Sequence, residues 1–183
     1  MAGTCDAPRL LARAALLLAE VDLVLGDPDP AREQAMDAFI RYERLGLREG
    51  MALASRLQAE INLRTGGSER ALQDARRAME LVEKGGYGSL VAGTSATLGE
   101  ALAERGDLAE AEKRIVAARD AARRLQDPAG EARAIRAMAT VLMRKRNPQQ
   151  AAALLHESLK VYDKVGDKVA CADGRVHYAG FLL

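Results

Sequence analysis

The sequence of 183 residues contains no tryptophan, and aromatic residues make up only 3% of it. A chain of this length is long enough to bury a sizeable core, so alanine and leucine must build that core in place of aromatic rings. Apolar residues account for 49% of the chain and charged residues for 29%, which is typical of a folded soluble protein. The abundance of alanine and leucine favours helices.

Cysteine and histidine are equally scarce. Cys5 and Cys171 lie at opposite ends of the chain without a CxxC motif, so the sequence predicts two free thiols and neither a zinc site nor a disulfide framework. His156 and His177 have no Cys, Asp or Glu at metal-ligand spacing. The glycine cluster at 85–88 lacks the preceding strand and the following Lys-Ser/Thr pair of a phosphate loop. We therefore expect no cofactor, no metal and no catalytic residues, and the chain is not expected to be an enzyme.

Strong charge of one sign and long apolar runs are also missing. The formal net charge of +1 offers no general attraction to nucleic acid or to anionic membranes. The longest apolar stretch, from Leu10 to Val24, is interrupted by Arg13 and Glu20 and has no small-residue cleavage pattern after it. It is also shorter than the ~20 residues that a membrane span requires. A cytoplasmic protein without nucleic-acid or membrane partners is the simplest interpretation.

A period of 40 residues runs through the sequence with no slip in register, and such a period is the mark of a repeat fold. Two columns of the repeat contain only alanine, a third contains only alanine or glycine, and a turn-forming pair stands at a constant distance before the first column. The columns are Ala31, Ala71, Ala111 and Ala151; Ala12, Ala52, Ala92, Ala132 and Ala172; and Ala19, Ala59, Gly99, Ala139 and Ala179, with turn pairs Gly26-Asp27, Gly66-Gly67, Gly106-Asp107 and Arg146-Asn147. Their joint recurrence establishes the repeat.

Each repeat predicts two helices. In the third copy, apolar or small residues recur at a spacing of three and four, first over 89–105 and again over 109–125, with Gly106-Asp107 between the two runs. Small side chains let two antiparallel helices approach closely. Glycine can adopt the left-handed geometry that ends a helix, and the Asp or Asn after it can accept hydrogen bonds from the amides that open the next one.

The pattern as a whole predicts an all-α fold. We expect nine helices, over 8–25, 29–45, 49–65, 69–84, 89–105, 109–126, 129–145, 148–165 and 168–182. They form one domain of residues 1–183, in which the hairpins 8–45, 49–84, 89–126 and 129–165 are followed by an unpaired helix, 168–182. No hairpin can bury its apolar face alone, so stacked neighbours create a continuous core and an α-solenoid with a concave side.

One stretch resembles a known family. The segment from Leu98 to Ala111, LGEALAERGDLAEA, is similar to the tetratricopeptide repeat signature, with its Leu-Gly pair, its Gly-Asp turn and the alanine of the second helix. The period of 40 residues is longer than the usual length of about 34. In this it resembles the long-hairpin variant found in bacterial signalling ATPases and activator-type transcription regulators. The resemblance implies a right-handed superhelix and a scaffold or sensor that binds a peptide, a partner protein or a small effector.

The resemblance also implies a groove lined by the first helix of each hairpin. In the fourth hairpin, Arg133, Arg136 and Arg144 face this groove with no acid among them and with Thr140 and Met143 beside them. They form the predicted anion-binding site, because the planar fork of arginine can grip a carboxylate with two hydrogen bonds. The second and third hairpins add Arg56, Leu57, Glu60, Arg64 and Glu100 to this face. The front half of the groove is apolar and suits a hydrophobic peptide or helix. Its residues are Leu16, Leu17, Leu23, Leu53, Leu57 and Leu63, with Arg13 and Glu20 beside them.

Three alternatives stay open at this point. Arg133 and Arg136 can instead bond to acidic groups of neighbouring hairpins, such as Glu100 and Glu104, and hold the stack in register. The groove can be empty, which would make the chain a structural spacer or a self-association module. The apolar end of the chain, 178–183, indicates either a piece of a longer array, which we favour, or self-association through the last helix.

Overall fold

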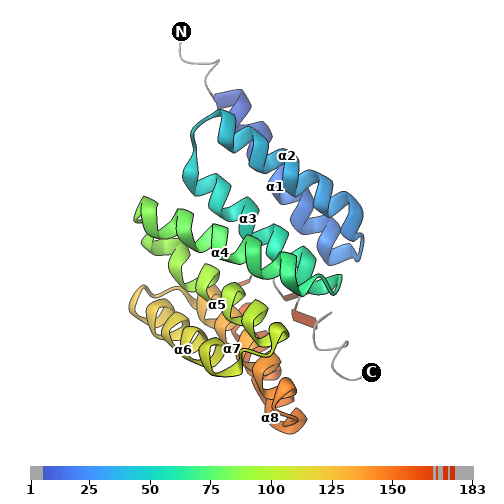
Figure 1. Ribbon diagram of the computed structural model, residues 1–183, viewed down its shortest axis with the longest axis vertical. Coiled ribbons are helices and arrows are strands. Elements are labelled where there is room, and N and C mark those ends of the chain that lie inside the picture. Colours follow the sequence, from blue (N-terminus) through green and yellow to red (C-terminus); the bar gives the residue numbers. More distant parts are fainter. Residues whose placement is uncertain (1–5, 167, 169–170, 173, 176–183) are drawn as a thin grey trace. The chain divides into compact units, whose positions relative to one another are not determined.

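The computed structural model describes residues 6–166, 168, 171–172 and 174–175, and every regular element in this part of the chain is a helix (Figure 1). The helices are α1 (Asp6–Leu25), α2 (Pro28–Arg44), α3 (Arg48–Arg64), α4 (Ser68–Gly85), α5 (Gly88–Arg105), α6 (Leu108–Arg124), α7 (Pro128–Arg144) and α8 (Pro148–Val165). The prediction of an all-α fold is confirmed, and the predicted helix ends lie within two residues of the observed ones. The described part holds eight helices, and the ninth predicted helix, 168–182, lies largely outside the described residues.

The helices pack in consecutive pairs. The chain divides into two compact units, residues 1–87 and residues 88–183. In the first unit α1 packs on α2 and α3 packs on α4, while in the second unit α5 packs on α6 and α7 packs on α8. The second helix of the leading hairpin also packs on the first helix of the next hairpin, α2 on α3 and α6 on α7. Each unit is therefore built from two stacked hairpins.

The repeat columns form the interior of these units. The column at Ala31, Ala71, Ala111 and Ala151 is fully buried, as are Ala19, Ala59 and Ala139 of the third column. At the remaining described position of that column, a side chain on Gly99 would collide with Ile115 of the paired helix α6. Because protein interiors are close-packed, the absence of a side chain at Gly99 is what lets α5 and α6 approach each other. The small columns are thus the contact surfaces of the hairpins.

The turns use a left-handed backbone residue at two recurrent positions. Gly26, Gly66 and Gly106 have positive φ at one position, and Gly46, Gly86 and Gly166 have positive φ at the other. The same two positions in the remaining copies hold Arg146, with φ of 59°, and Gln126, with φ of 53°. Side-chain caps are less regular than the sequence suggested, because Asp127 and Asn147 accept a hydrogen bond from an amide of the following helix whereas Asp27 and Asp107 do not.

Candidate functional site

The predicted arginine face of α7 lies against α5 within the second unit. Arg136 is only 4% exposed, and its guanidinium lies 3.6 Å from a carboxylate oxygen of Glu100. The other oxygen of Glu100 accepts a hydrogen bond of 3.3 Å from the hydroxyl of Thr140. One turn further along, Arg144 pairs with Glu104. The structure thus brings together five of the residues singled out in the sequence, as ion pairs and hydrogen bonds between two hairpins.

Arg133 completes this face. Its guanidinium lies over α5 at Gly93, where an added Cβ would stand 3.1 Å from Nη1. Met143 is half-buried and packs beside the small apolar cluster of Ala139, Ala151 and Leu155. A ligand carboxylate at Arg136 or Arg144 would have to displace Glu100 or Glu104, which already pair with these arginines. The sequence analysis allowed such a pair for Arg136 but did not include Arg144.

The predicted residues of α3 are likewise engaged within the first unit. Arg56 donates to Glu60 at 2.8 Å, and both side chains are largely buried. Arg64 donates to the backbone carbonyl of Leu23 at 2.9 Å, which ties α3 to the end of α1. Leu57 is buried in the apolar core of this unit. These four side chains therefore support the packing of α3, and they leave little surface for a ligand at their own positions.

An open cleft lies elsewhere in the first unit, between α1 and α3. These two helices touch much less than their counterparts α5 and α7 do, and the space between them is a cavity of about 330 Å³. Its lining combines apolar side chains with charged side chains of both signs. The lining residues are Arg9, Arg13, Leu16, Leu17 and Glu20 of α1, Tyr42 of α2, and Leu47, Glu49, Gly50 and Leu53 from the start of α3 and the turn before it.

Tyr42 forms the aromatic wall of this cleft. Its ring packs where a side chain on residue 50 would otherwise lie, so Gly50 is what lets the ring fit. Burial raises the pKa of Tyr42, although the positive charges of Arg13 and Arg9 oppose the shift. The phenol is therefore neutral at physiological pH, and its buried ring adds apolar surface to the lining of the cleft.

The sequence analysis predicted about half of the residues that line the cleft. Arg13, Leu16, Leu17, Glu20 and Leu53 were all placed on the groove side of their helices, by the register of the repeat together with the groove that the resemblance implies. The prediction did not include Tyr42, because it considered only the first helix of each hairpin and Tyr42 lies on α2. It also did not include the residues around the turn at Gly46, because their position depends on how this turn directs the chain into α3. A bulky aromatic followed eight residues later by a glycine, Tyr42 and Gly50, is the sequence signal for such a close contact.

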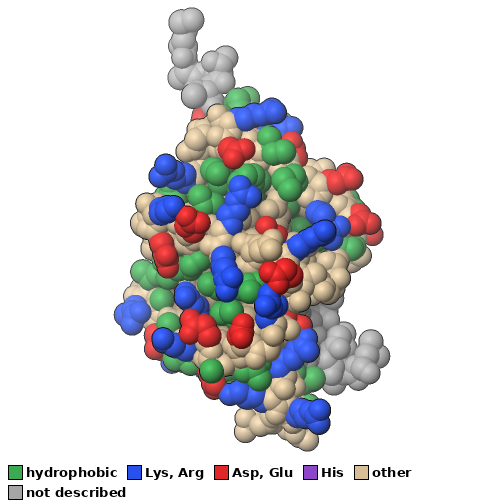
Figure 2. Space-filling model, in the orientation of Figure 1, with side chains coloured by type: hydrophobic (Ala, Val, Ile, Leu, Met, Phe, Trp, Pro, Cys, Tyr) green, Lys and Arg blue, Asp and Glu red, His purple; other side chains and the backbone are tan. Residues whose placement is uncertain are grey.

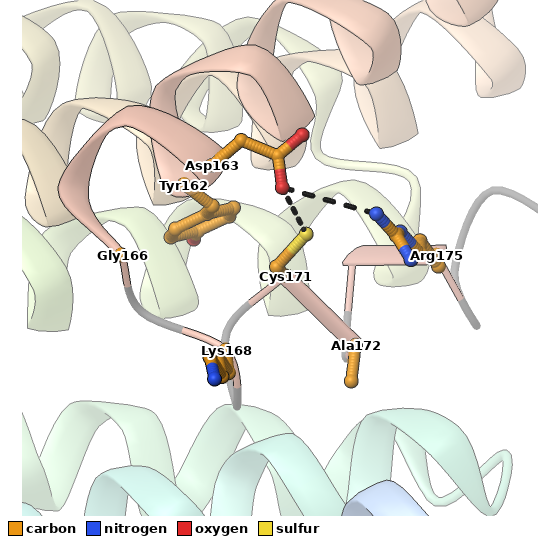
Figure 3. Close-up of a pocket in the computed structure, with 7 residues that line it drawn as sticks. All are labelled: Tyr162, Asp163, Gly166, Lys168, Cys171, Ala172 and Arg175. Atoms are coloured by element: carbon orange, nitrogen blue, oxygen red, sulfur yellow. Dashed lines mark hydrogen bonds and ion pairs between the residues drawn. The ribbon is translucent and has the colours of Figure 1, made fainter.

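A second cavity, of about 570 Å³, lies in the second unit beside the end of α8. Figure 3 shows dashed lines from one carboxylate oxygen of Asp163 to both Cys171 and Arg175. The thiol of Cys171 donates to Asp163 at 3.0 Å, and Arg175 lies 3.8 Å from the same oxygen. This hydrogen bond, together with burial, raises the pKa of Cys171. A thiol that is held protonated is a weak nucleophile, so the geometry does not suggest nucleophilic chemistry here.

Charge distribution, metal-binding groups and helix hydropathy complete the description of the described residues. Figure 2 shows acidic and basic side chains intermingled over the face in view, without a broad patch of one sign. Among the described residues, no group of three His, Cys, Asp or Glu side chains is placed to hold a metal ion. In the same part of the chain, no helix combines the length and the apolar character needed to cross a bilayer.

No family model matches the chain, and no curated protein is similar enough to it to be matched.

Proposed function

We propose that this chain is a non-catalytic binding module of the tetratricopeptide repeat type, and that it holds an apolar segment of a peptide or partner protein in the cleft between α1 and α3. The observation that supports the proposal is the cleft itself. It offers four leucines together with charged side chains of both signs, and such a surface suits an apolar or amphipathic peptide segment. The resemblance to bacterial regulators supports a role in a signalling or regulatory protein of the bacterial cytoplasm.

Charged side chains of both signs line the cleft. Arg9 and Arg13 lie at the beginning of α1, Glu20 lies two turns further along the same helix, and Glu49 lies in the first turn of α3. A peptide segment that carries both acidic and basic side chains beside its apolar ones would therefore find groups of opposite charge in the cleft.

A structural role is the second candidate, and one observation favours it in the second unit. There the face between α5 and α7 is filled by the pairs of Arg136 with Glu100 and of Arg144 with Glu104. A surface that satisfies its own charges in this way holds two hairpins in register, and it needs no ligand to do so. We therefore assign peptide binding to the first unit. For the face between α5 and α7, the structural role competes with the earlier prediction of an anion site on α7.

A peptide array probed with the whole chain tests the proposal, with affinities of the selected peptides then measured by fluorescence anisotropy. Leu53→Glu places a charge among the residues that line the cleft and is expected to weaken binding at least tenfold. Leu125→Glu is the matched control, because Leu125 is an exposed leucine of the second unit, and it is expected to leave binding unchanged. If Arg144→Ala weakens binding and Leu53→Glu does not, the ligand lies on α7 and our assignment is wrong. If no peptide binds, the structural role takes its place.

A further inference from the structure

The outer face of α1 carries an exposed apolar stripe. Half of the large apolar side chains that are well exposed in the described part of the chain lie on this one helix. Leu11, Ala14, Leu18, Val21 and Leu25 form the stripe, because their spacing of three and four places them on one face of the helix. The four large side chains among them are 43% to 71% exposed. A contiguous apolar face of this kind marks an interaction surface.

The same repeat positions are buried in the first helix of the later hairpin of each unit. The equivalents of Ala14 and Val21, 40 and 120 positions further along the chain, are Ala54, Ile61, Ala134 and Val141. All four are fully buried, whereas Val21 is 43% exposed. In these hairpins the second helix of the preceding hairpin packs on the first helix, α2 on α3 and α6 on α7. The stripe of α1 is thus a surface that such a helix covers elsewhere in the chain.

Two contacts in the first unit show how the covering helix lies. The stripe positions of α3 include Gln58 and, just after the helix, Thr65. Gln58 donates to the sulfur of Met36 at 3.8 Å, and Arg32 donates to the hydroxyl of Thr65 at 3.4 Å. Residue numbers rise along α3 as they fall along α2, so the two helices run antiparallel.

The second unit repeats this arrangement with charged side chains. Glu131 of α7 holds a stripe position and accepts hydrogen bonds from Arg119 and Arg123 of α6 at 3.2 and 2.7 Å. Lys145, which follows α7 and holds another stripe position, donates at 2.6 Å to Glu112 of α6. The later residues of α6 meet the start of α7 and an earlier residue meets its end, so this pair is antiparallel as well.

These contacts define which positions of the covering helix face the stripe. Shifted back by two repeats, the contacting residues of α6 correspond to positions 32, 39 and 43, and the contacting residues of α2 are at positions 32 and 36. The four positions are spaced by four, three and four residues. They therefore lie on one face of the covering helix and follow the stripe over about three turns.

The chemistry of the stripe differs between α1 and the covered helices. In α3 and α7 the contacts at the edge of the stripe are made by polar and charged side chains. In α1 the same positions hold Leu11, Leu18 and Leu25, which can make none of these hydrogen bonds. Because a polar side chain that faced these leucines would lose water without gaining a partner, a helix that fits α1 is apolar at its own facing positions.

We propose that the stripe binds the second helix of a further hairpin of this 40-residue repeat, antiparallel to α1 and apolar at the four facing positions. A second helix of the repeat is the element that covers this face in α3 and in α7, and the contacts there fix its direction and register. The interaction is independent of the proposed peptide cleft, because none of the five stripe residues is among those that line the cleft.

A helical probe derived from α2 tests the proposal. The probe is a synthetic peptide of residues 28–47 with Arg32→Leu and Glu43→Leu, so that Met36 and Phe39 complete four apolar facing positions. A hydrocarbon staple on the opposite face keeps it helical. With the labelled probe and the whole chain, we expect saturable binding by fluorescence anisotropy. The stapled peptide with the original Arg32 and Glu43 is expected to bind at least fivefold more weakly.

Variants of the chain locate the probe. Leu18→Glu is expected to weaken binding at least tenfold with an unchanged circular dichroism spectrum. Val116→Glu alters a comparably exposed apolar residue on α6 and is expected to leave binding unchanged. The absence of saturable binding overturns the proposal, as does equal binding to Leu18→Glu and to the parent chain.

Two measurements without the probe identify other occupants. A dimer of the chain in light scattering that is lost in Leu18→Glu assigns the stripe to a second copy and overturns the proposal. Sedimentation of the chain with anionic phospholipid vesicles that is lost in the same variant assigns the stripe to a lipid surface, with the same consequence.

Disulfide trapping tests the direction of the bound helix. The native thiols of the chain are first removed by Cys5→Ser and Cys171→Ser, and the probe carries Arg32→Cys. Under mild oxidation we expect this probe to couple to a chain with Leu25→Cys and not to a chain with Leu11→Cys. The reverse preference would show parallel packing, and equal coupling to both would show that no register is selected. Either result contradicts the proposed interface.

Discussion

Glu100 of α5 and Arg136 of α7 form a buried ion pair between two hairpins, with an oxygen and a nitrogen 3.6 Å apart and both side chains at most 5% exposed. At this distance the two groups attract each other without forming a hydrogen bond of normal length. The hydroxyl of Thr140 binds the other oxygen of Glu100. Because a buried charge is costly unless it is paired, we expect this cluster to disfavour any other register between α5 and α7.

Removal of one partner is therefore expected to be costly. Glu100→Ala leaves the guanidinium of Arg136 buried without its carboxylate, and we expect the free energy of unfolding to fall by about 3–5 kcal/mol. Glu110→Ala breaks the exposed pair of Glu110 and Arg114 on α6 and should cost less than about 1 kcal/mol. Urea denaturation followed by circular dichroism measures both.

The double variant Glu100→Leu with Arg136→Met separates charge from packing. Because apolar residues of similar volume often replace a buried ion pair without loss, the double variant should be more stable than Glu100→Ala. If it is as unstable as the single variant, the cost comes from lost packing and the ion pair is not its cause.

The repeat predicted most of the fold because its signals are local. Small columns, Gly turns and three-and-four spacing depend only on neighbouring residues, and they located all eight described helices. Which charges meet across hairpins was not decided by these signals. Arg136 and Glu100 were both placed on the groove side. Because α5 and α7 approach each other closely, the face between them is filled, whereas the wider separation of α1 and α3 leaves a cleft between those two helices. That spacing depends on how whole helices pack, which no single column encodes.

Two turns carry a residue that is unfavourable for their backbone. Gln126 and Arg146 adopt positive φ where equivalent turns use glycine. Left-handed geometry costs a residue with a side chain roughly 1–2 kcal/mol, and the greater freedom of glycine in the unfolded chain offsets part of the gain. We expect Gln126→Gly and Arg146→Gly each to raise the free energy of unfolding by about 0.5–1 kcal/mol.

The reverse change at an equivalent turn is the control. Gly106 has φ of 91° and open space around its α-carbon, so Gly106→Ala should destabilise the chain through backbone strain alone. Thermal melts of the three variants beside the parent chain give the comparison. A lower melting temperature for Gln126→Gly would show that its side chain makes a contact worth more than the strain.

The thiol of Cys171 is expected to react slowly. Its hydrogen bond to Asp163, with burial as a further cause, raises its pKa, and only the thiolate attacks thiol reagents. In a Cys5→Ser background, the reaction with Ellman's reagent at pH 8 should be slower than that of the same chain unfolded in urea. Asp163→Ala removes the hydrogen bond and should accelerate the folded-state reaction several-fold, whereas Asp163→Glu should do so less. Equal rates for all three folded chains would show that access alone limits the reaction.

Acid is expected to weaken the contact between α6 and α7. Burial alone would raise the pKa of Glu131, but the hydrogen bonds and positive charges of Arg123 and Arg119 outweigh it, so the pKa lies below its ordinary value of 4.5. A carboxyl group whose pKa is lower in the folded state adds stability above its unfolded pKa and loses that contribution as the pH falls through the folded value.

Glu131→Gln should therefore cost on the order of 1 kcal/mol at pH 7. The difference between Glu131→Gln and the parent chain should shrink as the pH falls below 4.5. Urea denaturation at several pH values measures it, with Glu157→Gln, which alters another acidic partner of Arg119, as the comparison. A difference that stays constant with pH would mean that the two arginines do not lower the pKa of Glu131.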